Sequence, residues 1–293
     1  MRVTQSMLSS NSLRHLSSSY EKLGNYQDQL ATGQKITRPS QDPVVAMKGM
    51  YYRSNLTENE QYQRNLSEAY LWMDNSEAGL EHASQALERV QYLIIQGKND
   101  TYSDEDRVAI AQEIEQIKQD MVEVANTKVA GRYIYNGTDV DHAPVAKGNP
   151  PVVNMNTEDY AVEVSAGLKL KVNVNGDKVF NQALFNTLEG IKQGFSDDTY
   201  SAEGMDNLLK DLEGQISTLQ AERSEAGARY NRLEMIENRL GKTEVMAKSI
   251  ISDNEDADIE QVITNLKNQE SVHRAALSVG ARIIQPTLMD FLR

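Results

Sequence analysis

The fold of this chain is decided by residues 62–94, which read YQRNLSEAYLWMDNSEAGLEHASQALERVQYLI. Apolar or small residues recur in this stretch at alternating spacings of four and three. An α-helix brings such positions onto one stripe, so the pattern predicts a long helix with a coiled-coil seam. The seam positions are Tyr62, Leu66, Ala69, Met73, Ser76, Leu80, Ala83, Leu87, Val90 and Ile94.

Two further stripes predict helices that pack beside this one. The first follows a turn and an acidic helix start at 97–106, and contains Ile110, Ile114, Ile117, Met121 and Val124, closed by Lys128. The second contains Met205, Leu209, Leu212, Ile216, Leu219, Arg223, Ala226, Tyr230, Leu233 and Leu240. Arg223 interrupts this seam, where we expect it to set the register or mark an exposed end rather than act in catalysis.

Both ends of the chain also read as helices, each with a single apolar stripe that something must cover. We expect the two ends to cover each other as a thin two-helix layer, and to order fully when neighbouring copies cover the rest. Ordinary fraying of terminal helices is the alternative. The predicted assembly residues are Leu13, Leu16, Tyr20, Leu23, Leu30, Ile259, Val262, Leu266, Leu277, Ile284, Leu288 and Phe291.

One region breaks the helical pattern. After Pro144, Pro150 and Pro151, apolar residues alternate with polar ones from Tyr160 to Val174, and Asn175-Gly176 is a strong signal for a two-residue hairpin turn. The expected fold class is therefore mainly α, a long antiparallel helical coiled-coil bundle formed by both chain halves, with a small β-hairpin-rich insertion. The expected sections are paired terminal helices at 1–35 and 255–293, a bundle body at 36–137 and 182–254, and the β insertion at 138–181.

Composition excludes several classes of function. The 293 residues carry a formal net charge of −13, which argues against nucleic acid as a partner, because phosphate binding needs clustered Lys and Arg. The chain contains no cysteine, which excludes disulfides and thiolate catalysis. No apolar run approaches the roughly 20 residues of a membrane-spanning helix, and the first twenty residues lack the apolar stretch of a cleavable signal peptide. We therefore expect a protein that neither binds nucleic acid nor inserts into a membrane.

A search for catalytic, cofactor-binding or metal-binding motifs finds none. The four histidines are scattered and lack carboxylates at metal-ligand spacing. Gly241-Lys242-Thr243 imitates the end of a phosphate-binding loop, but Ile236 stands where the motif needs glycine. The acids from Asp253 to Asp258 lack the glycine of a calcium loop and are better explained as a helix start. We expect no enzyme activity and no cofactor.

Both ends of the chain resemble one known family. Residues 30–46, LATGQKITRPSQDPVVA, closely resemble the N-terminal signature of bacterial flagellins, in which a helix ends at a glycine turn before an Asp-Pro connector. Residues 225–234, EAGARYNRLE, are similar to a C-terminal helix of that family. Residues 255–259, EDADI, are similar to the short acidic link before its last helix.

Three other stretches separate the branches of the family. Residues 131–138, 183–188 and 285–292 resemble the members that join hook and filament more than the filament flagellins. The resemblance implies a structural role in a junction layer made of copies of this chain, with hook-associated protein 1 on the hook side and flagellin on the filament side. It further implies unfolded export through the flagellar type III apparatus, a cytoplasmic export chaperone, and a final location outside the cell on the flagellum. Filament flagellin is the alternative, and a cytosolic helical scaffold is a more distant one.

Overall fold

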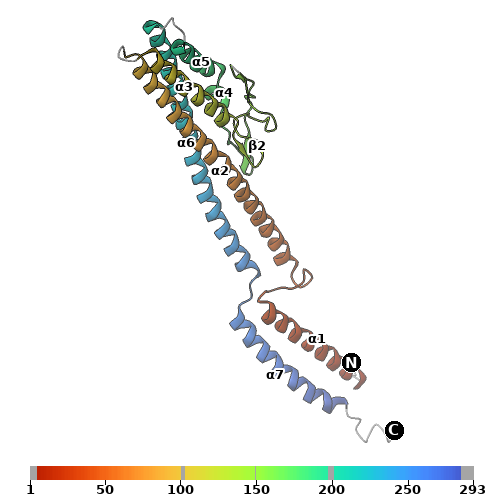
Figure 1. Ribbon diagram of the computed structural model, residues 1–293. Coiled ribbons are helices and arrows are strands. Elements are labelled where there is room, and N and C mark those ends of the chain that lie inside the picture. The colour runs from red at the N-terminus through yellow and green to blue at the C-terminus, as the bar shows by residue number, and fades with distance from the viewer. Residues whose placement is uncertain (1–4, 100–102, 149, 197–200, 285–293) are drawn as a thin grey trace, which may run out of the picture. The chain divides into compact units, whose positions relative to one another are not determined.

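The computed structural model describes residues 5–99, 103–148, 150–196 and 201–284, and most of these residues are helical (Figure 1). The mainly α fold class expected from the sequence is confirmed. No helix within the described ranges is both long enough and apolar enough to span a membrane. The helices are α1 (Gln5–Thr32), α2 (Pro43–Gly97), α3 (Asp104–Ala125), α4 (Gly176–Val179), α5 (Gln182–Ser196), α6 (Ala202–Glu255) and α7 (Ile259–Ile284).

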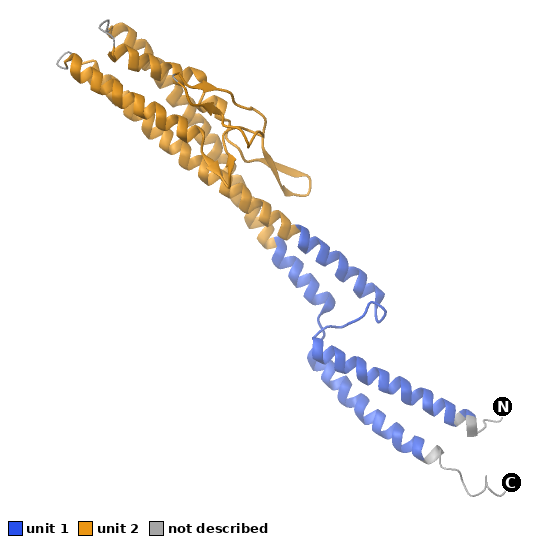
Figure 2. Cartoon of the chain, turned by 45° about the vertical axis from the view of Figure 1, so that its right-hand side comes forward, with its two compact units in different colours: residues 1–58, 243–293 blue, residues 59–242 orange. Residues whose placement is uncertain are grey.

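The chain forms two compact units, coloured separately in Figure 2. Unit 1 comprises residues 1–58 and 243–293, and unit 2 comprises residues 59–242. Unit 1 thus contains α1, α7, the start of α2 and the end of α6, and unit 2 contains everything between.

The seam of α2 lies at the centre of unit 2. Nine of the ten seam residues expected from the sequence are buried, and Tyr62 is partly buried against the same core. The second and third stripes also face inward, since Ile114, Met121, Leu212 and Leu233 are all buried. The single tryptophan, Trp72, lies in this core as well.

Helices α2 and α6 run antiparallel in unit 2, because their polar contacts join residues in opposite order along the chain. Lys98 pairs with Asp206 at one end, and the Tyr70 hydroxyl donates to Glu237 Oε2 at 2.8 Å nearer the other. Between them, Arg223 donates from Nη2 to Glu77 Oε1 at 2.5 Å. Arg223 is half-buried and bridges the two helices.

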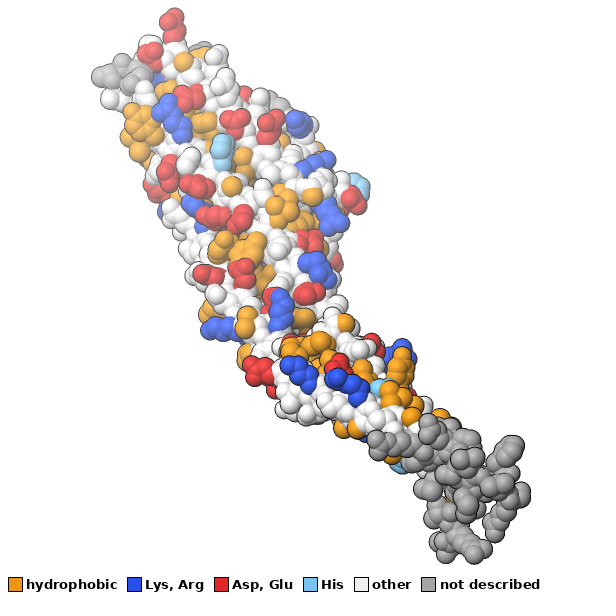
Figure 3. Space-filling model, turned by 90° about the horizontal axis from the view of Figure 1, so that it is seen from below, with side chains coloured by type: hydrophobic (Ala, Val, Ile, Leu, Met, Phe, Trp, Pro, Cys, Tyr) orange, Lys and Arg blue, Asp and Glu red, His pale blue; other side chains and the backbone are white. Residues whose placement is uncertain are grey.

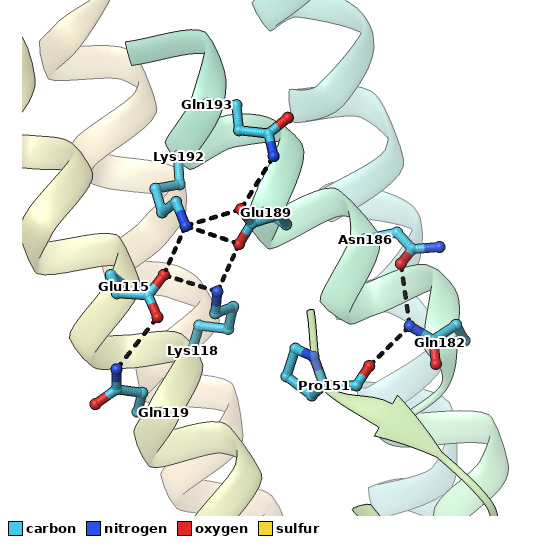
Figure 4. A network of polar contacts seen from close by, with 9 residues as sticks. All are labelled: Glu115, Lys118, Gln119, Pro151, Gln182, Asn186, Glu189, Lys192 and Gln193. Atoms are coloured by element: carbon cyan, nitrogen blue, oxygen red, sulfur yellow. Dashed lines mark hydrogen bonds and ion pairs between the residues drawn. The ribbon is translucent and has the colours of Figure 1, made fainter. Parts of the chain in front are cut away.

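A buried network of charges joins α3 to α5 (Figure 4). The Lys118 side chain is only 2% exposed, and its Nζ lies 2.7 Å from Glu115 Oε2 and 2.5 Å from Glu189 Oε2. Lys192 Nζ completes the network at 3.1 Å from Glu115 Oε2 and 2.8 Å from Glu189 Oε1. Burial alone would raise the pKa of Glu189, but hydrogen bonds from Lys118, Lys192 and Gln193 outweigh it and lower that pKa to about 2.

The described residues contain three separate antiparallel pairs of strands, of which the first lies just before the expected β insertion and the other two lie within it. Two predictions for this region were wrong. Lys128 does not close the helical stripe, because α3 ends at Ala125 and its backbone turns at Asn126 into the first strand. The strands are β1 (Lys128–Val129), β2 (Arg132–Tyr133), β3 (Val145–Ala146), β4 (Val152–Val153), β5 (Ala161–Ser165) and β6 (Leu168–Lys171).

The second wrong prediction concerns the hairpin turn. Asn175-Gly176 does not join two strands but opens the short helix α4, with Asn175 at its N-cap. The long hairpin turns instead at Ala166-Gly167, between β5 and β6, where Gly167 has a φ of 70°. A left-handed backbone of this kind favours glycine. Asn175-Gly176 has the right residues for a tight turn, but the short helix α4 follows it instead of a strand.

Candidate functional site: the surface of unit 1

Helix α1 ends at a glycine, and the chain beyond it is tied to the other end of the sequence. Gly33 has a φ of 71°, and its N–H donates to Gln29 O at 2.9 Å. The Gly33 carbonyl then accepts from Ala257 N at 2.7 Å, and Lys35 N donates to Glu255 O at 2.6 Å. Two segments more than two hundred residues apart are thus joined by a short backbone ladder, which we call the clasp (residues 33–35 with 253–257).

The start of α2 is fixed by Asp42. Its Oδ1 accepts from Val44 N at 2.9 Å and from Val45 N at 3.1 Å, as an N-cap residue should. Pro43 occupies the first helical position, where its fixed φ suits the helix and its missing N–H costs nothing. The Asp-Pro pair that carried much of the family resemblance therefore starts a helix.

The end of α6 packs tightly against the start of α2. Glu255, whose side chain is largely buried, accepts from Arg53, and Asn254 Nδ2 donates to Val45 O at 3.0 Å. A Cβ placed on Gly49 would lie 2.1 Å from Glu255 Oε1, so a larger residue here would require the Glu255 side chain to move. Lys35 Nζ adds a bond to Asp253 O at 2.5 Å.

The acids from 253 to 258 therefore do not all belong to a helix start, as the sequence suggested. Asp253 and Glu255 lie in the last turn of α6, and only Asp258 caps α7, by accepting from Gln261 N at 3.1 Å. The link between α6 and α7 is so short that the same acidic run includes the end of α6 and the cap of α7. Among the described residues, no group of three or more His, Asp or Glu side chains is placed to hold a metal ion.

Helices α1 and α7 pair in antiparallel fashion through a seam that is mostly polar or small. Gln269 Nε2 donates to Ser19 Oγ at 2.8 Å, and the Tyr20 and His273 rings lie 6.0 Å apart between centroids. The inward-facing positions step regularly by threes and fours. They are Ser9, Ser12, Leu16, Ser19, Leu23 and Tyr26 on α1, and Val262, Leu266, Gln269, His273, Ala276 and Gly280 on α7.

The predicted assembly residues divide into three groups. Leu16, Leu23, Val262 and Leu266 lie in the seam of the helix pair. Leu13, Tyr20, Leu30, Ile259 and Leu277 are exposed, with Tyr20 the most open at 72%. Leu288 and Phe291 lie outside the described residues, as does the side chain of Ile284. The serines and Gln269 were missed because large apolar residues indicate a seam more strongly than small or polar ones, although their spacing of three and four is visible in the sequence.

Large hydrophobic side chains are distributed very unevenly between the units. Among the described residues, 16 of the 23 exposed large hydrophobics belong to unit 1, although it is the smaller unit. Val262 is the only buried hydrophobic residue of unit 1 in the same ranges, and the rest of the core lies in unit 2. Apolar side chains reach the surface beside charged ones on the face drawn in Figure 3. The described part of unit 1 thus has a large apolar surface and almost no core.

Charge is distributed just as unevenly. Unit 1 contains 12 Lys and Arg and 12 Asp and Glu, so it is formally neutral, whereas unit 2 contains 18 and 31 and carries the whole charge of −13. Copies of a strongly charged surface repel one another, and copies of a neutral surface do not. The neutral unit is therefore the one that can pack closely against its own copies.

Comparison with known proteins assigns the chain to a family. The model of the bacterial flagellin N-terminal helical region matches residues 3–139, and that of the bacterial flagellin C-terminal helical region matches residues 209–292. The chain belongs to the bacterial flagellin family. The clasp and the α1–α7 pair thus lie within the two helical regions that define flagellins, and the β insertion lies largely between them.

Relatives within the flagellin family include both branches considered from the sequence. Flagellar hook-associated protein 3 of Escherichia coli (strain K12) is 24% identical over 94% of this chain and 95% of its own length. Flagellin of Bacillus subtilis (strain 168) is 24% identical over 86% of this chain and 87% of its own length. The solved flagellar junction protein FlgL of Legionella pneumophila is 16% identical, with a TM-score of 0.60 over 71% of this chain and all of that one.

Proposed function

We propose that this chain is the structural protein of the flagellar hook–filament junction, and that it assembles by packing unit 1 against unit 1 of neighbouring copies. The observation that carries the proposal is the apolar surface of unit 1, which has almost no core of its own to stabilise it. A buried Leu or Ile side chain contributes about 1.5–3 kcal/mol. Neighbouring copies that cover Leu13, Tyr20 and Leu277 would therefore supply the missing stabilisation.

The remaining parts of the proposal follow from this arrangement and from the named relatives. Hook-associated protein 1 would lie on the hook side of the layer and flagellin on the filament side. Before assembly, the chain would cross the type III export apparatus unfolded, with an export chaperone holding it in the cytoplasm, and it would then reside outside the cell. The chain would act as a structural part and not as an enzyme. The terminal sections 1–35 and 255–293 would serve as its assembly segments.

Deletion of the gene tests the role. Hooks without filaments, together with flagellin released into the medium, are the expected result for a junction protein. The similarity to Bacillus subtilis flagellin supports a second candidate, the filament subunit itself. Loss of filaments without released flagellin would favour that candidate. Motile cells with normal filaments would refute both.

A pair of substitutions tests the surface. Leu13→Ser on unit 1 should abolish filament attachment while leaving the unfolding of unit 2 unchanged, because Leu13 is exposed and does not belong to unit 2. Leu71→Ser is the matched control, since Leu71 is similarly exposed but belongs to unit 2. Equal loss of attachment in both variants would refute the assignment of assembly to unit 1. So would hydrogen exchange showing full protection of α1 and α7 in a dilute monomer.

A further inference from the structure

The methionines of this chain divide between the two units by exposure. All four described methionines of unit 1 are exposed: Met7 at 55%, Met47 at 62%, Met50 at 64% and Met246 at 59%. In unit 2, by contrast, three of the five are fully buried and one is half-buried. Met235, at 67%, is the one exposed methionine of unit 2 within the described residues. The exposed thioethers are thus concentrated on the neutral, apolar unit.

Three of these methionines lie close along the chain to other exposed apolar residues. Val44 and Tyr51 share the first turns of α2 with Met47 and Met50, and Val245 and Ile250 flank Met246 on α6. A methionine suits a contact surface because its unbranched, polarizable side chain adapts to irregular partners. The same sulfur is also the atom in such a surface that mild oxidants attack.

We infer that Met7, Met47, Met50 and Met246 are the oxidation sites at which hydrogen peroxide switches off the docking of a second copy of this chain. The inference rests on the proposed function, since the occupant of the surface is another unit 1. A second copy is favoured over other occupants because unit 1 is formally neutral while the whole charge of −13 sits on unit 2. A neutral apolar surface packs against its own copy without repulsion.

The chemistry needs only peroxide and the thioether. A sulfur lone pair attacks one peroxide oxygen, the O–O bond breaks, and the sulfoxide forms while the other oxygen leaves as water after a proton transfer. Sulfur is oxidised by two electrons and peroxide is reduced by two. The product is a polar sulfoxide, whose oxygen would lose its hydrogen bonds to water on being buried against a neighbour. Oxidised copies should therefore stay apart, and methionine sulfoxide reductases should restore them.

The experiment uses the purified full chain, hydrogen peroxide and two readouts. Peptide mapping by mass spectrometry gives the oxidation rate of each methionine, and sedimentation velocity over a concentration series gives self-association. The four exposed methionines of unit 1 should oxidise at least tenfold faster than Met73, Met121 and Met205, which are buried. Self-association should weaken at least tenfold and recover after treatment with the reductases.

Leucine variants separate the site from a general effect of peroxide. The variant M7L/M47L/M50L/M246L keeps the apolar volume without the sulfurs and should self-associate normally after peroxide treatment. M235L is the matched control and should remain as sensitive as the unaltered chain. Self-association that survives full oxidation, or a quadruple variant that remains sensitive, would overturn the inference. Failure of the untreated chain to self-associate at all would overturn the proposed assembly itself, whatever the oxidation map shows.

Discussion

Replacing Lys118 by methionine should strongly destabilise unit 2. The substitution keeps the packing of the long side chain but removes the cation that lies 2.5 Å from Glu189 Oε2 and 2.7 Å from Glu115 Oε2. Breaking a buried ion pair by removing one partner costs about 3–5 kcal/mol, because a charge is left buried without compensation. Lys192 still contacts both carboxylates, so we expect a loss at the lower end, about 3 kcal/mol.

Trp72 provides the assay. It is the only tryptophan and is buried in the core of unit 2, so its fluorescence during denaturation reports on this unit alone. For a unit of this size, a loss of about 3 kcal/mol should lower the melting temperature by roughly 6–12 °C. Lys192→Met is the control. Its side chain is 19% exposed against 2% for that of Lys118, so we expect a smaller loss.

A double variant distinguishes an uncompensated charge from simple loss of packing. Lys118→Met combined with Glu189→Leu removes both charges, and well-packed apolar replacements of a buried pair are often close to neutral. We expect the double variant to regain at least half of the loss. The reasoning would be refuted if Lys118→Met cost no more than Lys192→Met, or if the double variant were less stable than Lys118→Met.

Three other predictions concern acid, the core and the clasp. The pKa of Glu189 is lowered to about 2, so the contribution of its charge to stability is present above the ordinary carboxyl range and should be lost as the pH falls from about 4 to 2. In acid denaturation curves, the difference in the free energy of unfolding between the unaltered chain and Lys118→Met should therefore narrow over that interval. Leu80→Ala should cost unit 2 about 2–5 kcal/mol by Trp72 fluorescence, because Leu80 is fully buried; Leu71→Ala, on the exposed side of the same helix, should stay within about 0.5 kcal/mol, and equal losses would contradict the assigned seam. Asp42→Ala should weaken the first turn of α2 by about 1 kcal/mol, seen as faster amide exchange at Val44 and Val45 with no change in the Trp72 transition; unchanged exchange there would argue against the cap.

The sequence predicts the helices of unit 2 well because their seams consist of large apolar residues at strict helical spacing. A stripe such as Leu80, Leu87 and Ile94 has no alternative to burial, so pattern and structure agree. The terminal helices are harder. Leu13 and Tyr20 look like seam residues, yet they face outward while Ser12 and Ser19 face α7. In the terminal helices some apolar residues face outward rather than the core of their own chain, and the two kinds have the same spacing in the sequence.

Local turn signals also need their surroundings to be interpreted. Asn175-Gly176 and Ala166-Gly167 each can form a tight turn, and only the register of β5 with β6 decides between them. The clasp could not be found from spacing at all. It joins Lys35 to Asp253 across 218 residues, and neither segment has a sequence pattern that predicts contact with the other.

The separation of these contacts along the chain orders the events of folding. Ser19 and Gln269 are 250 residues apart, and closing a free loop of that length costs about 5 kcal/mol of chain entropy before any contact repays it. Once unit 2 has folded, however, the part of that loop between residues 59 and 242 has already been closed. A chain that emerges N-terminus first therefore keeps α1 unpaired until α7 has emerged. The α1–α7 pair is thus one of the last contacts to form.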